Sequence, residues 1–314
     1  MLNILLDAWS SLIPPWSCAS VPPEPRGQFK YGCHGDGKRT LHYRLFIPGG
    51  RRQRPMPLIV MLHGCSQDAS DFARGTGMNA LAERHGFLVL YPEQSASAHW
   101  NRCWNWYDQA HHARGRGEPA LIAGLTRHVM AEHPVDPKRV AVAGLSAGGA
   151  MAVILGRTYP DLFGAVGCHS GMAHGSATSG AGAMLAMRNG PGPSPQASAQ
   201  SGVPVIVFHG DADTTVHRSN GSGVVRQSVD SQTSGKPDTD AGVFVVEETG
   251  RTDGRAFTRR THHGSTGGIL AEHWTVHGAG HAWSGGEPGG THTDMHGPKA
   301  SEEMLRFFSN CLAA

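Results

Sequence analysis

The sequence predicts an α/β protein whose mostly parallel sheet is covered by helices on both faces. Two observations carry this prediction. Short continuous apolar runs bounded by turn residues, such as residues 57–62 and 87–91, are typical of strands buried on both faces of a parallel sheet. Segments with helical spacing of apolar residues, such as residues 118–133, lie between such runs. This alternation indicates parallel strands joined by crossover helices.

The predicted elements follow one another along most of the chain. We expect strands at residues 41–47, 57–62, 87–91, 139–143, 165–168 and 203–208, helices at residues 68–85, 118–133, 147–158 and 298–311, and late, partly antiparallel strands at residues 243–247, 256–261 and 271–277. Residues 172–202 are rich in Gly, Ala, Ser and Pro, which predicts an inserted cap or loop with a short helix at residues 183–188. Residues 219–242 are expected to be loop-rich.

The chain is interpreted as one domain with an extension before it. Residues 1–39 are assigned to an N-terminal extension and residues 40–314 to a single catalytic domain that contains the insert near residues 172–202. The apolar start has no Lys or Arg before it and is interrupted by Asp7 and Pro14, so we do not expect a standard secretory signal peptide. No apolar run approaches the roughly 20 residues that a membrane-spanning helix needs.

Composition excludes several classes of partner. The 314 residues include 27 Lys and Arg against 25 Asp and Glu, a formal net charge of +2. Because this surplus is small, neither nucleic acid nor an anionic membrane is predicted as a partner. The six cysteines are scattered and form no C-x-x-C pair, so a zinc ribbon or a thioredoxin-type motif is not expected.

The strongest local signal is the run Gly144-Leu145-Ser146-Ala147-Gly148, a G-x-S-x-G pattern. A nucleophile at a tight turn from a strand to a helix has a strained backbone, and its neighbours two residues away must be small. A predicted buried strand precedes this run and a predicted helix follows it. The alternative is a glycine turn with a purely structural role. We predict that Ser146 is a catalytic nucleophile.

A serine nucleophile needs a base and an orienting acid, which in this fold follow it in the order acid and then histidine. His281 lies in a glycine-rich loop after the last predicted strand, and we assign it as the base; His277 ends a strand pattern, which suits packing or solvent exposure. The acid should follow the strand at residues 203–208. We assign Asp213 as the orienting carboxylate and Asp211 as a turn residue, although both satisfy the order.

An oxyanion hole needs two backbone N–H donors. The residue after the nucleophile, Ala147, supplies one, and Cys65 in the loop after the strand at residues 57–62 is the candidate for the other. Cys65 and Cys103 could also form a disulfide that fixes this loop, and a free buried cysteine is the equally weighted alternative.

Aromatic and histidine clusters in the sequence are open to both structural and functional interpretations. Trp104, Trp106 and Trp283 could form an apolar wall for the substrate, although such aromatic residues are commonly plain core residues. The pair His262-His263 and the group His292, Asp294 and His296 are interpreted as exposed loop residues rather than metal ligands. No H-E-x-x-H motif and no phosphate-binding loop is present, so no metal and no cofactor is predicted.

Five runs in the same order resemble the poly(3-hydroxybutyrate) depolymerase-like esterase family, the type 1 catalytic domain related to feruloyl and acetylxylan esterases. They are His63-Gly64-Cys65-Ser66-Gln67, Cys103-Trp104-Asn105-Trp106, Gly144-Leu145-Ser146-Ala147-Gly148-Gly149, His209-Gly210-Asp211-Ala212-Asp213 and Gly280-His281-Ala282-Trp283-Ser284-Gly285-Gly286. The resemblance covers roughly residues 40–310. It implies an α/β-hydrolase fold, a triad of Ser146, Asp213 and His281, and an oxyanion hole at Cys65 and Ala147.

The same resemblance implies hydrolysis of short-chain hydroxyalkanoate esters or related carboxylic esters. It also favours an extracellular or periplasmic location. Because no signal peptide is evident and no C-terminal linker and substrate-binding domain follows the last helix, soluble esters or oligomers are expected rather than solid polymer. The alternatives are a feruloyl or acetylxylan esterase, an acyltransferase with the same triad, and a non-catalytic binding protein on the same fold. The sequence leaves the oligomeric state open.

Overall fold

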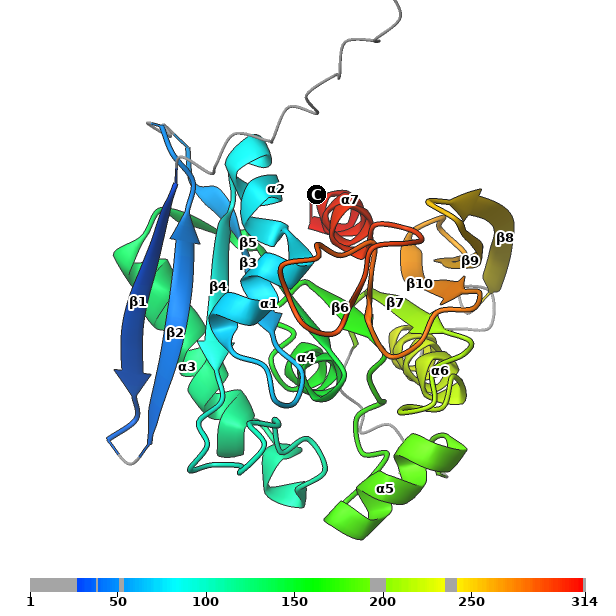
Figure 1. Ribbon diagram of the computed structural model, residues 1–314, viewed down its shortest axis with the longest axis horizontal. Helices are drawn as coiled ribbons and strands as arrows, with labels where there is room; N and C mark the ends of the chain where they lie inside the picture. The colour runs from blue at the N-terminus through cyan, green and yellow to red at the C-terminus, as the bar shows by residue number, and fades with distance from the viewer. Residues whose placement is uncertain (1–26, 38, 51–53, 193–201, 235–241, 313–314) are drawn as a thin grey trace, which may run out of the picture.

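A ten-stranded sheet forms the centre of the protein in the computed structural model, which describes residues 27–37, 39–50, 54–192, 202–234 and 242–312 (Figure 1). Within these residues the strand order is β1-β2-β4-β3-β5-β6-β7-β10-β9-β8. The six strands from β4 to β10 in this order are mutually parallel, and β1, β2, β9 and β8 are antiparallel additions at the two edges. The prediction of a mostly parallel sheet is therefore confirmed.

The strands of this sheet are β1 Gln28–Gly35, β2 Thr40–Ile47, β3 Met56–Leu62, β4 Leu88–Glu93, β5 Val135–Leu145, β6 Ala165–His169, β7 Val205–Gly210, β8 Val243–Thr252, β9 Arg255–Gly264 and β10 Ile269–Val276. A small second sheet pairs β11 Trp283–Ser284 with β12 Thr293–Asp294. The helices are α1 Ala69–Thr76, α2 Met78–His85, the 3-10 turn η1 Gln109–His111, α3 Gly117–Glu132, α4 Ala147–Thr158, α5 Gly180–Asn189, α6 Ser219–Thr233 and α7 Ala300–Leu312.

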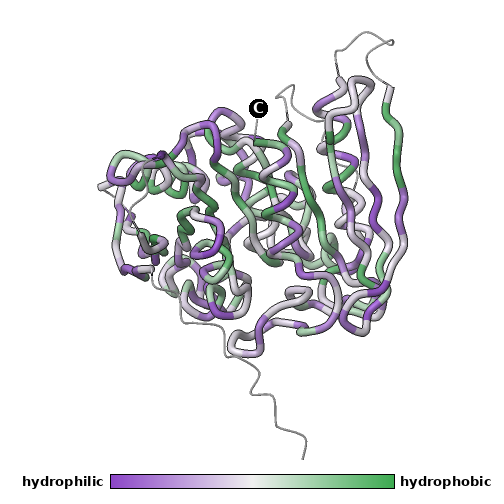
Figure 2. Tube along the Cα trace, turned by 90° about the horizontal axis from the view of Figure 1, so that it is seen from above, coloured by the Kyte–Doolittle hydropathy of each residue, from purple (hydrophilic) through white to green (hydrophobic). Residues whose placement is uncertain are grey.

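Two apolar cores lie on opposite faces of the sheet. Alternate residues of β3 point to opposite faces: Leu58 and Val60 belong to the core that also contains residues of α3, α4 and α6, whereas Ile59 and Met61 pack with residues of α1, α2 and α7. Figure 2 shows the hydrophobic segments of this sheet between more polar outer loops. The central strands are apolar on both sides because both faces are covered.

Three elements differ from the sequence prediction. The helix expected at residues 68–85 is two helices, α1 and α2, because Gly77 adopts a φ of 62° that ends the first helix. The segment expected to be loop-rich contains α6, whose Val224 and Val225 are buried, and this tertiary packing outweighs the low helix propensity of its Gly and Ser residues. Strand β1 lies within the predicted extension and pairs with β2.

The predicted insert contains α5, which is longer than the short helix expected there. Its end is held by the loop after β7 and by the first turn of α6: the N–H of His217 donates to the carbonyl of Met187 (2.7 Å), and the Asn220 amide in α6 donates to the carbonyl of Ala186 (2.9 Å). The sequence run considered as a signal peptide lies outside the described residues. No helix in the described part of the chain has both the length and the hydropathy needed to span a bilayer.

Candidate active site

Ser146 occupies the turn between β5 and α4. Its backbone has a φ of 56° and a ψ of −118°, a conformation that costs a residue with a side chain on the order of 1–3 kcal/mol. Two hydrogen bonds hold the turn: the N–H of Ser146 donates to the carbonyl of His169 (2.8 Å), and the N–H of Ala150 donates to the carbonyl of Ser146 (2.9 Å). The partly exposed Ser146 therefore lies at the amino end of α4, where the helix dipole favours negative charge.

The two glycines of the G-x-S-x-G pattern are required sterically. A Cβ atom on Gly144 would lie 2.4 Å from the carbonyl carbon of Gly148, and one on Gly148 would lie 2.1 Å from the carbonyl oxygen of Leu62. Both distances are far shorter than a van der Waals contact. The pattern is therefore a consequence of how closely β3, β5 and α4 approach one another at this turn.

His281 and Asp213 form a hydrogen-bonded pair at the same end of the sheet. The Nδ1 of His281 lies 2.8 Å from Oδ2 of Asp213. The other carboxylate oxygen, Oδ1, accepts the N–H groups of Thr215 (2.9 Å) and Val216 (2.8 Å). The Asp213 side chain is fully buried, whereas the His281 side chain is 13% exposed. The imidazole is thus held from behind and keeps an accessible edge.

The environment of Asp213 keeps its carboxylate ionised. Burial alone would raise the pKa of Asp213, but hydrogen bonds from His209 and His281 and the backbone N–H of Val216 lower that pKa far below its ordinary value. The Nε2 of His209 donates to the carbonyl of Val216 (2.8 Å) and lies 3.5 Å from Oδ2 of Asp213. A buried carboxylate that stays charged can orient an imidazole and stabilise its protonated form.

His169 connects the Ser146 turn with the loop that carries His281. Its carbonyl accepts the N–H of Ser146, and its ring Nε2 accepts the N–H of Ser284 (3.0 Å), three residues after His281. The ring stacks on Trp283, with centroids 5.2 Å apart. Burial, with a smaller contribution from His209 and His281, lowers the pKa of His169 to about 3. This neutral ring therefore fixes two distant segments to each other.

The alternative acid and base form a separate pair. The Nδ1 of His277 lies 2.7 Å from Oδ2 of Asp211, and the N–H of Gly278 donates to Oδ1 of Asp211 (2.7 Å). The Nε2 of His277 lies 3.0 Å from the hydroxyl of Thr258. The side chains of His277 and Asp211 are 42% and 25% exposed. This pair joins the loop that follows β7 to the loop that follows β10.

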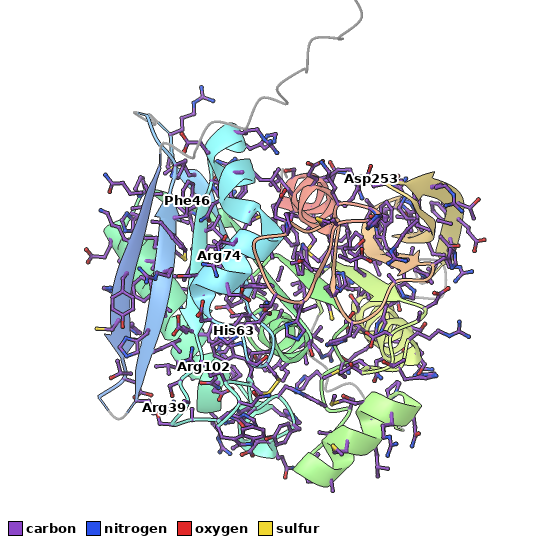
Figure 3. All side chains as sticks on the ribbon, viewed as in Figure 1. Arg39, Phe46, His63, Arg74, Arg102 and Asp253 are labelled. Carbon is purple, nitrogen blue, oxygen red and sulfur yellow. A yellow bond between two sulfur atoms is a disulfide. The ribbon has the colours of Figure 1, made fainter. Side chains whose placement is uncertain are left out.

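The loop after β3 is rigidly held by the ring of His63, which is labelled in Figure 3. The Nε2 of His63 accepts the N–H of Gln94 (3.0 Å), so its Nδ1 carries the proton and donates to the carbonyl of Gly64 (2.7 Å). Complete burial lowers the pKa of His63 and keeps the ring neutral. The indole N–H of Trp104 donates to the carbonyl of His63 (3.2 Å).

This loop, whose Gly64 lies close to Leu145, carries Cys65. Cys65 and Cys103 are joined by a disulfide, which decides between the two interpretations of these cysteines and ties the loop to the aromatic loop after β4. The N–H of Ser66 also donates to the carbonyl of Asn101 (2.8 Å). Within the described residues, neither the Cys65 amide nor the Ala147 amide donates a hydrogen bond, so both are available to a ligand oxygen.

The structure places the three predicted wall tryptophans in the core. Trp104 is 0% exposed, Trp283 is 1% exposed and Trp106 is 4% exposed. The Trp283 indole N–H donates to the hydroxyl of Ser301 (3.0 Å) and is not free for a ligand. These residues pack in the core beneath the loops of the site. Their burial favours core packing over a substrate wall.

Other apolar residues that the sequence analysis did not single out are exposed on loops and helices of this region. Trp100 is 83% exposed in the loop that the disulfide tethers, next to Asn101, whose carbonyl holds Ser66. Met184 and Leu185 are 63% and 61% exposed on α5. The sequence does not identify them, because the residue type of a tryptophan, methionine or leucine does not separate exposure from burial.

The described residues contain no cluster of three or more His, Cys, Asp or Glu side chains that could hold a metal ion. Asp294 instead accepts the guanidinium N–H of Arg255 at Nε (2.7 Å), and its other oxygen accepts the N–H of His296 (3.0 Å). Asp294 is thus engaged in a structural ion pair, and His292 and His296 are exposed.

The fold and the turn at Ser146 define an α/β-hydrolase. A structural comparison agrees: the acetyl xylan esterase from Aspergillus awamori superimposes with a TM-score of 0.66 at 19% identity, covering 90% of this chain and 99% of that chain. At this identity the likeness shows the fold alone. The model of the esterase PHB depolymerase family matches residues 41–250, and the chain belongs to this family.

Two relatives indicate the range of this family. Poly(3-hydroxyalkanoate) depolymerase C of Paucimonas lemoignei is 32% identical over 258 residues, which cover 79% of this chain and 59% of the relative. A probable acetylxylan esterase A of Aspergillus clavatus is 29% identical over 245 residues, which cover 70% of this chain and 75% of the relative. The chain thus spans little more than half of the depolymerase that it matches. The predicted family resemblance is confirmed.

Proposed function

We propose that the protein is a serine carboxylic-ester hydrolase that works through an acyl-enzyme, with Ser146 as nucleophile, His281 as base and Asp213 as orienting acid. The observation that carries the proposal is that the Asp213–His281 hydrogen bond and the strained Ser146 turn are fastened together through His169. Family membership supports the reaction class, because the matching relatives are named as depolymerases and esterases.

The geometry supports a two-step acyl transfer. The Ser146 hydroxyl attacks the ester carbonyl while His281 accepts its proton at Nε2, and the N–H groups of Cys65 and Ala147 stabilise the oxyanion. His281 then gives the proton to the departing alcohol. In the second step His281 takes a proton from water, the hydroxide attacks the acyl group, and the acid leaves as Ser146 regains its proton.

Among the described residues, Ser146 and His281 do not form a hydrogen bond to each other. In ligand-free hydrolases such catalytic hydrogen bonds are often long and shorten only when the substrate is bound. The proposal therefore requires the His281 loop to approach Ser146 in the complex. The hydrogen bond from the N–H of Ser284 to Nε2 of His169, whose carbonyl accepts the N–H of Ser146, keeps this loop tied to the Ser146 turn.

Short-chain hydroxyalkanoate esters, their oligomers or the polyester are the proposed substrates. The name of the Paucimonas relative supports this choice, and the exposed Trp100, Met184 and Leu185 offer apolar contact area for such a chain. Feruloyl or acetylxylan ester hydrolysis is the second candidate, favoured by the coverage of the Aspergillus clavatus relative.

A substrate panel with wild type and Ser146→Ala tests both the proposed nucleophile and the proposed substrate class. We expect wild type to cleave 3-hydroxybutyrate oligomers faster than acetylated xylan or methyl ferulate. Ser146→Ala should lower kcat by a factor on the order of 10⁶, because a missing nucleophile removes the acyl-enzyme route. The unfolding transition of the variant, measured by circular dichroism, controls for misfolding. A folded variant that retains half of the activity would disprove the role of Ser146.

A further inference from the structure

Arg157 is a buried arginine in the last turn of α4, at the opposite end of this helix from Ser146, and it has no hydrogen-bond or ion-pair partner among the described residues. The residue is 5% exposed. Its Nε and Nη1 atoms are buried and form no hydrogen bond within the described part of the chain. The ion pairs of those residues do not include it either; the nearby Asp161, for example, pairs with Arg114 and Arg127.

Such a position is costly for a guanidinium. Removing a charged group from water costs several kcal/mol unless an opposite charge and hydrogen bonds compensate, and buried polar groups in native proteins are almost always satisfied. Burial lowers the pKa of Arg157, but an arginine side chain does not lose its proton in a protein. The last turn of a helix favours a cation, yet it provides no acceptor for Nε and Nη1.

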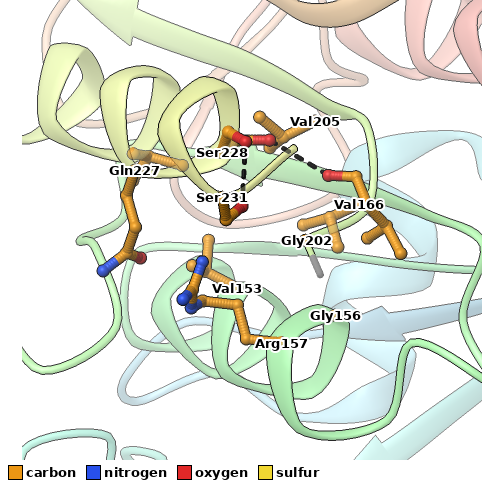
Figure 4. Close-up of a pocket in the computed structure, with 11 residues that line it drawn as sticks. Val153, Gly156, Arg157, Val166, Gly202, Val205, Gln227, Ser228 and Ser231 are labelled. Carbon is orange, nitrogen blue, oxygen red and sulfur yellow. Dashed lines mark hydrogen bonds between the residues drawn. The ribbon is translucent and has the colours of Figure 1, made fainter. Parts of the chain in front are cut away.

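A small cavity of about 20 Å³, enough for a single water molecule or a small ion, lies beside this side chain, between α4, α6, β6 and β7. In Figure 4 the Arg157 side chain extends from α4 toward the side of the cavity formed by α6, where Gln227 and Ser231 lie. The residues that line the cavity are Val153, Gly156, Arg157, Val166, Gly202, Val203, Val205, Val224, Gln227, Ser228 and Ser231. None of them carries a carboxylate.

The polar side chains of the lining are committed to other partners. The Ser228 hydroxyl donates to the carbonyl of Val203 (3.0 Å), and the Ser231 hydroxyl donates to the carbonyl of Ser228 (2.9 Å). The Gln227 amide accepts the N–H of His174 (2.9 Å) and donates to its carbonyl (2.8 Å). The guanidinium is therefore the unused donor of this cavity, and its other walls are mainly valine side chains.

We propose that the cavity beside Arg157 binds a small monovalent inorganic anion of the size of chloride. The anion supplies the missing negative charge and accepts the N–H groups of Nε and Nη1. The valine side chains around the pair reduce its contact with water, which strengthens the attraction between the ion and the guanidinium. The ligand is bound at the end of α4 remote from Ser146, so its role is to stabilise the packing of α4 against α6 rather than to enter the ester reaction.

Thermal unfolding at constant ionic strength tests this proposal. Protein prepared in sodium gluconate, whose anion is too large for the cavity, is titrated with sodium chloride as gluconate is withdrawn. We expect the Tm of wild type to rise by about 3 °C once chloride reaches tenfold its dissociation constant, because the ligand binds only the native state. An unchanged Tm would show that the cavity holds water only and would overturn the proposal.

Variants test whether the rise in Tm with chloride comes from this cavity. Arg157→Met keeps the length of the side chain and removes its charge, so the rise in Tm with chloride should vanish, whereas Arg157→Lys should retain part of it. Arg226→Met, which removes an exposed arginine from the neighbouring helix α6, is the matched control and should respond to chloride as wild type does. An equal chloride response in Arg157→Met would refute the assignment.

A crystal of wild type soaked in sodium bromide gives a readout that does not depend on the variants folding. Bromide replaces chloride in such sites, and its anomalous signal locates it directly. A peak within hydrogen-bond distance of the Arg157 guanidinium supports the proposal, and bromide peaks confined to the protein surface contradict it. None of these measurements uses ester hydrolysis, so they stand or fall independently of the proposed enzymatic function.

Discussion

Three buried histidines predict that the fold loses stability steeply in mild acid. Burial, followed by the charge of neighbouring groups, lowers the pKa of His169 and of His273 to about 3, and that of His174 to about 4. In the unfolded chain the same side chains titrate near 6.5. Between these limits the unfolded chain binds protons that the native protein does not bind. The stabilisation is therefore complete above about pH 6.5 and is lost as the pH falls toward the native pKa values.

The expected decrease in the free energy of unfolding follows from the number of protons that only the unfolded chain binds. One proton taken up only on unfolding changes the free energy of unfolding by about 1.4 kcal/mol per pH unit. Three such histidines give a slope of about 3 kcal/mol per unit near pH 6, which approaches about 4 kcal/mol per unit near pH 5. Integrated from pH 6.5 to pH 5, the loss is about 5 kcal/mol, which is comparable to the whole stability of many domains.

Urea unfolding followed by tryptophan fluorescence at about pH 7, 6 and 5 measures this slope. His273→Leu isolates one contribution, because the buried Nε2 of His273 has no hydrogen-bond partner within the described residues. This variant should reduce the slope by about a third. His85→Gln, at an exposed position on α2, is the control and should leave the slope unchanged. A wild-type slope under about 1 kcal/mol per unit, or an unchanged slope in His273→Leu, would refute the reasoning.

Two further predictions concern the site. Asp213→Asn should lower kcat about 10⁴-fold while the fold persists, because the amide favours the wrong tautomer of His281; Asp211→Asn should keep most activity, and equal losses in ester hydrolysis assays would contradict the distinction. Replacing Cys65 and Cys103 by serine opens a loop closed over 38 residues, which should lower the free energy of unfolding by about 4 kcal/mol in urea titrations; an unchanged midpoint would show that the disulfide does not stabilise the native state.

The sequence predicted those strands and helices whose own residues carry a clear hydrophobic pattern. The buried central strands are continuous apolar runs, so the expected strands at residues 57–62 and 87–91 coincide with β3 and β4 to within a residue or two. Helix α6 was missed because its Gly and Ser residues lack an apolar stripe and are helical through contact with β7 and β10. Strand β1 was missed because it is largely exposed and has no alternating pattern to detect.

Residues of the candidate site also differ in whether local sequence alone or the folded environment identifies them. Ser146 could be proposed as the candidate nucleophile from the sequence because the steric requirement of its turn is met by the glycines two positions away on either side. Asp211 and Asp213 could not be separated with the same clarity, since both follow β7. Their difference lies in burial and pairing: the Asp213 side chain is enclosed, whereas a quarter of the Asp211 side chain is exposed. The three tryptophans were ambiguous for the same reason, because residue type does not reveal depth.

Neutral buried histidines link the positioning of the loops at the candidate site to the acid sensitivity of the native state. One neutral imidazole offers a donor and an acceptor on a rigid ring, which is how His63 holds Gln94 and Gly64 at once and how His169 holds Ser284. A lysine or a carboxylate cannot do both without carrying a charge into the core. Protonation of His169 would remove the acceptor at Nε2 and release the N–H of Ser284, three residues after His281. The ring that fastens the proposed catalytic loops is therefore also one of the rings whose low pKa makes the native state vulnerable to acid.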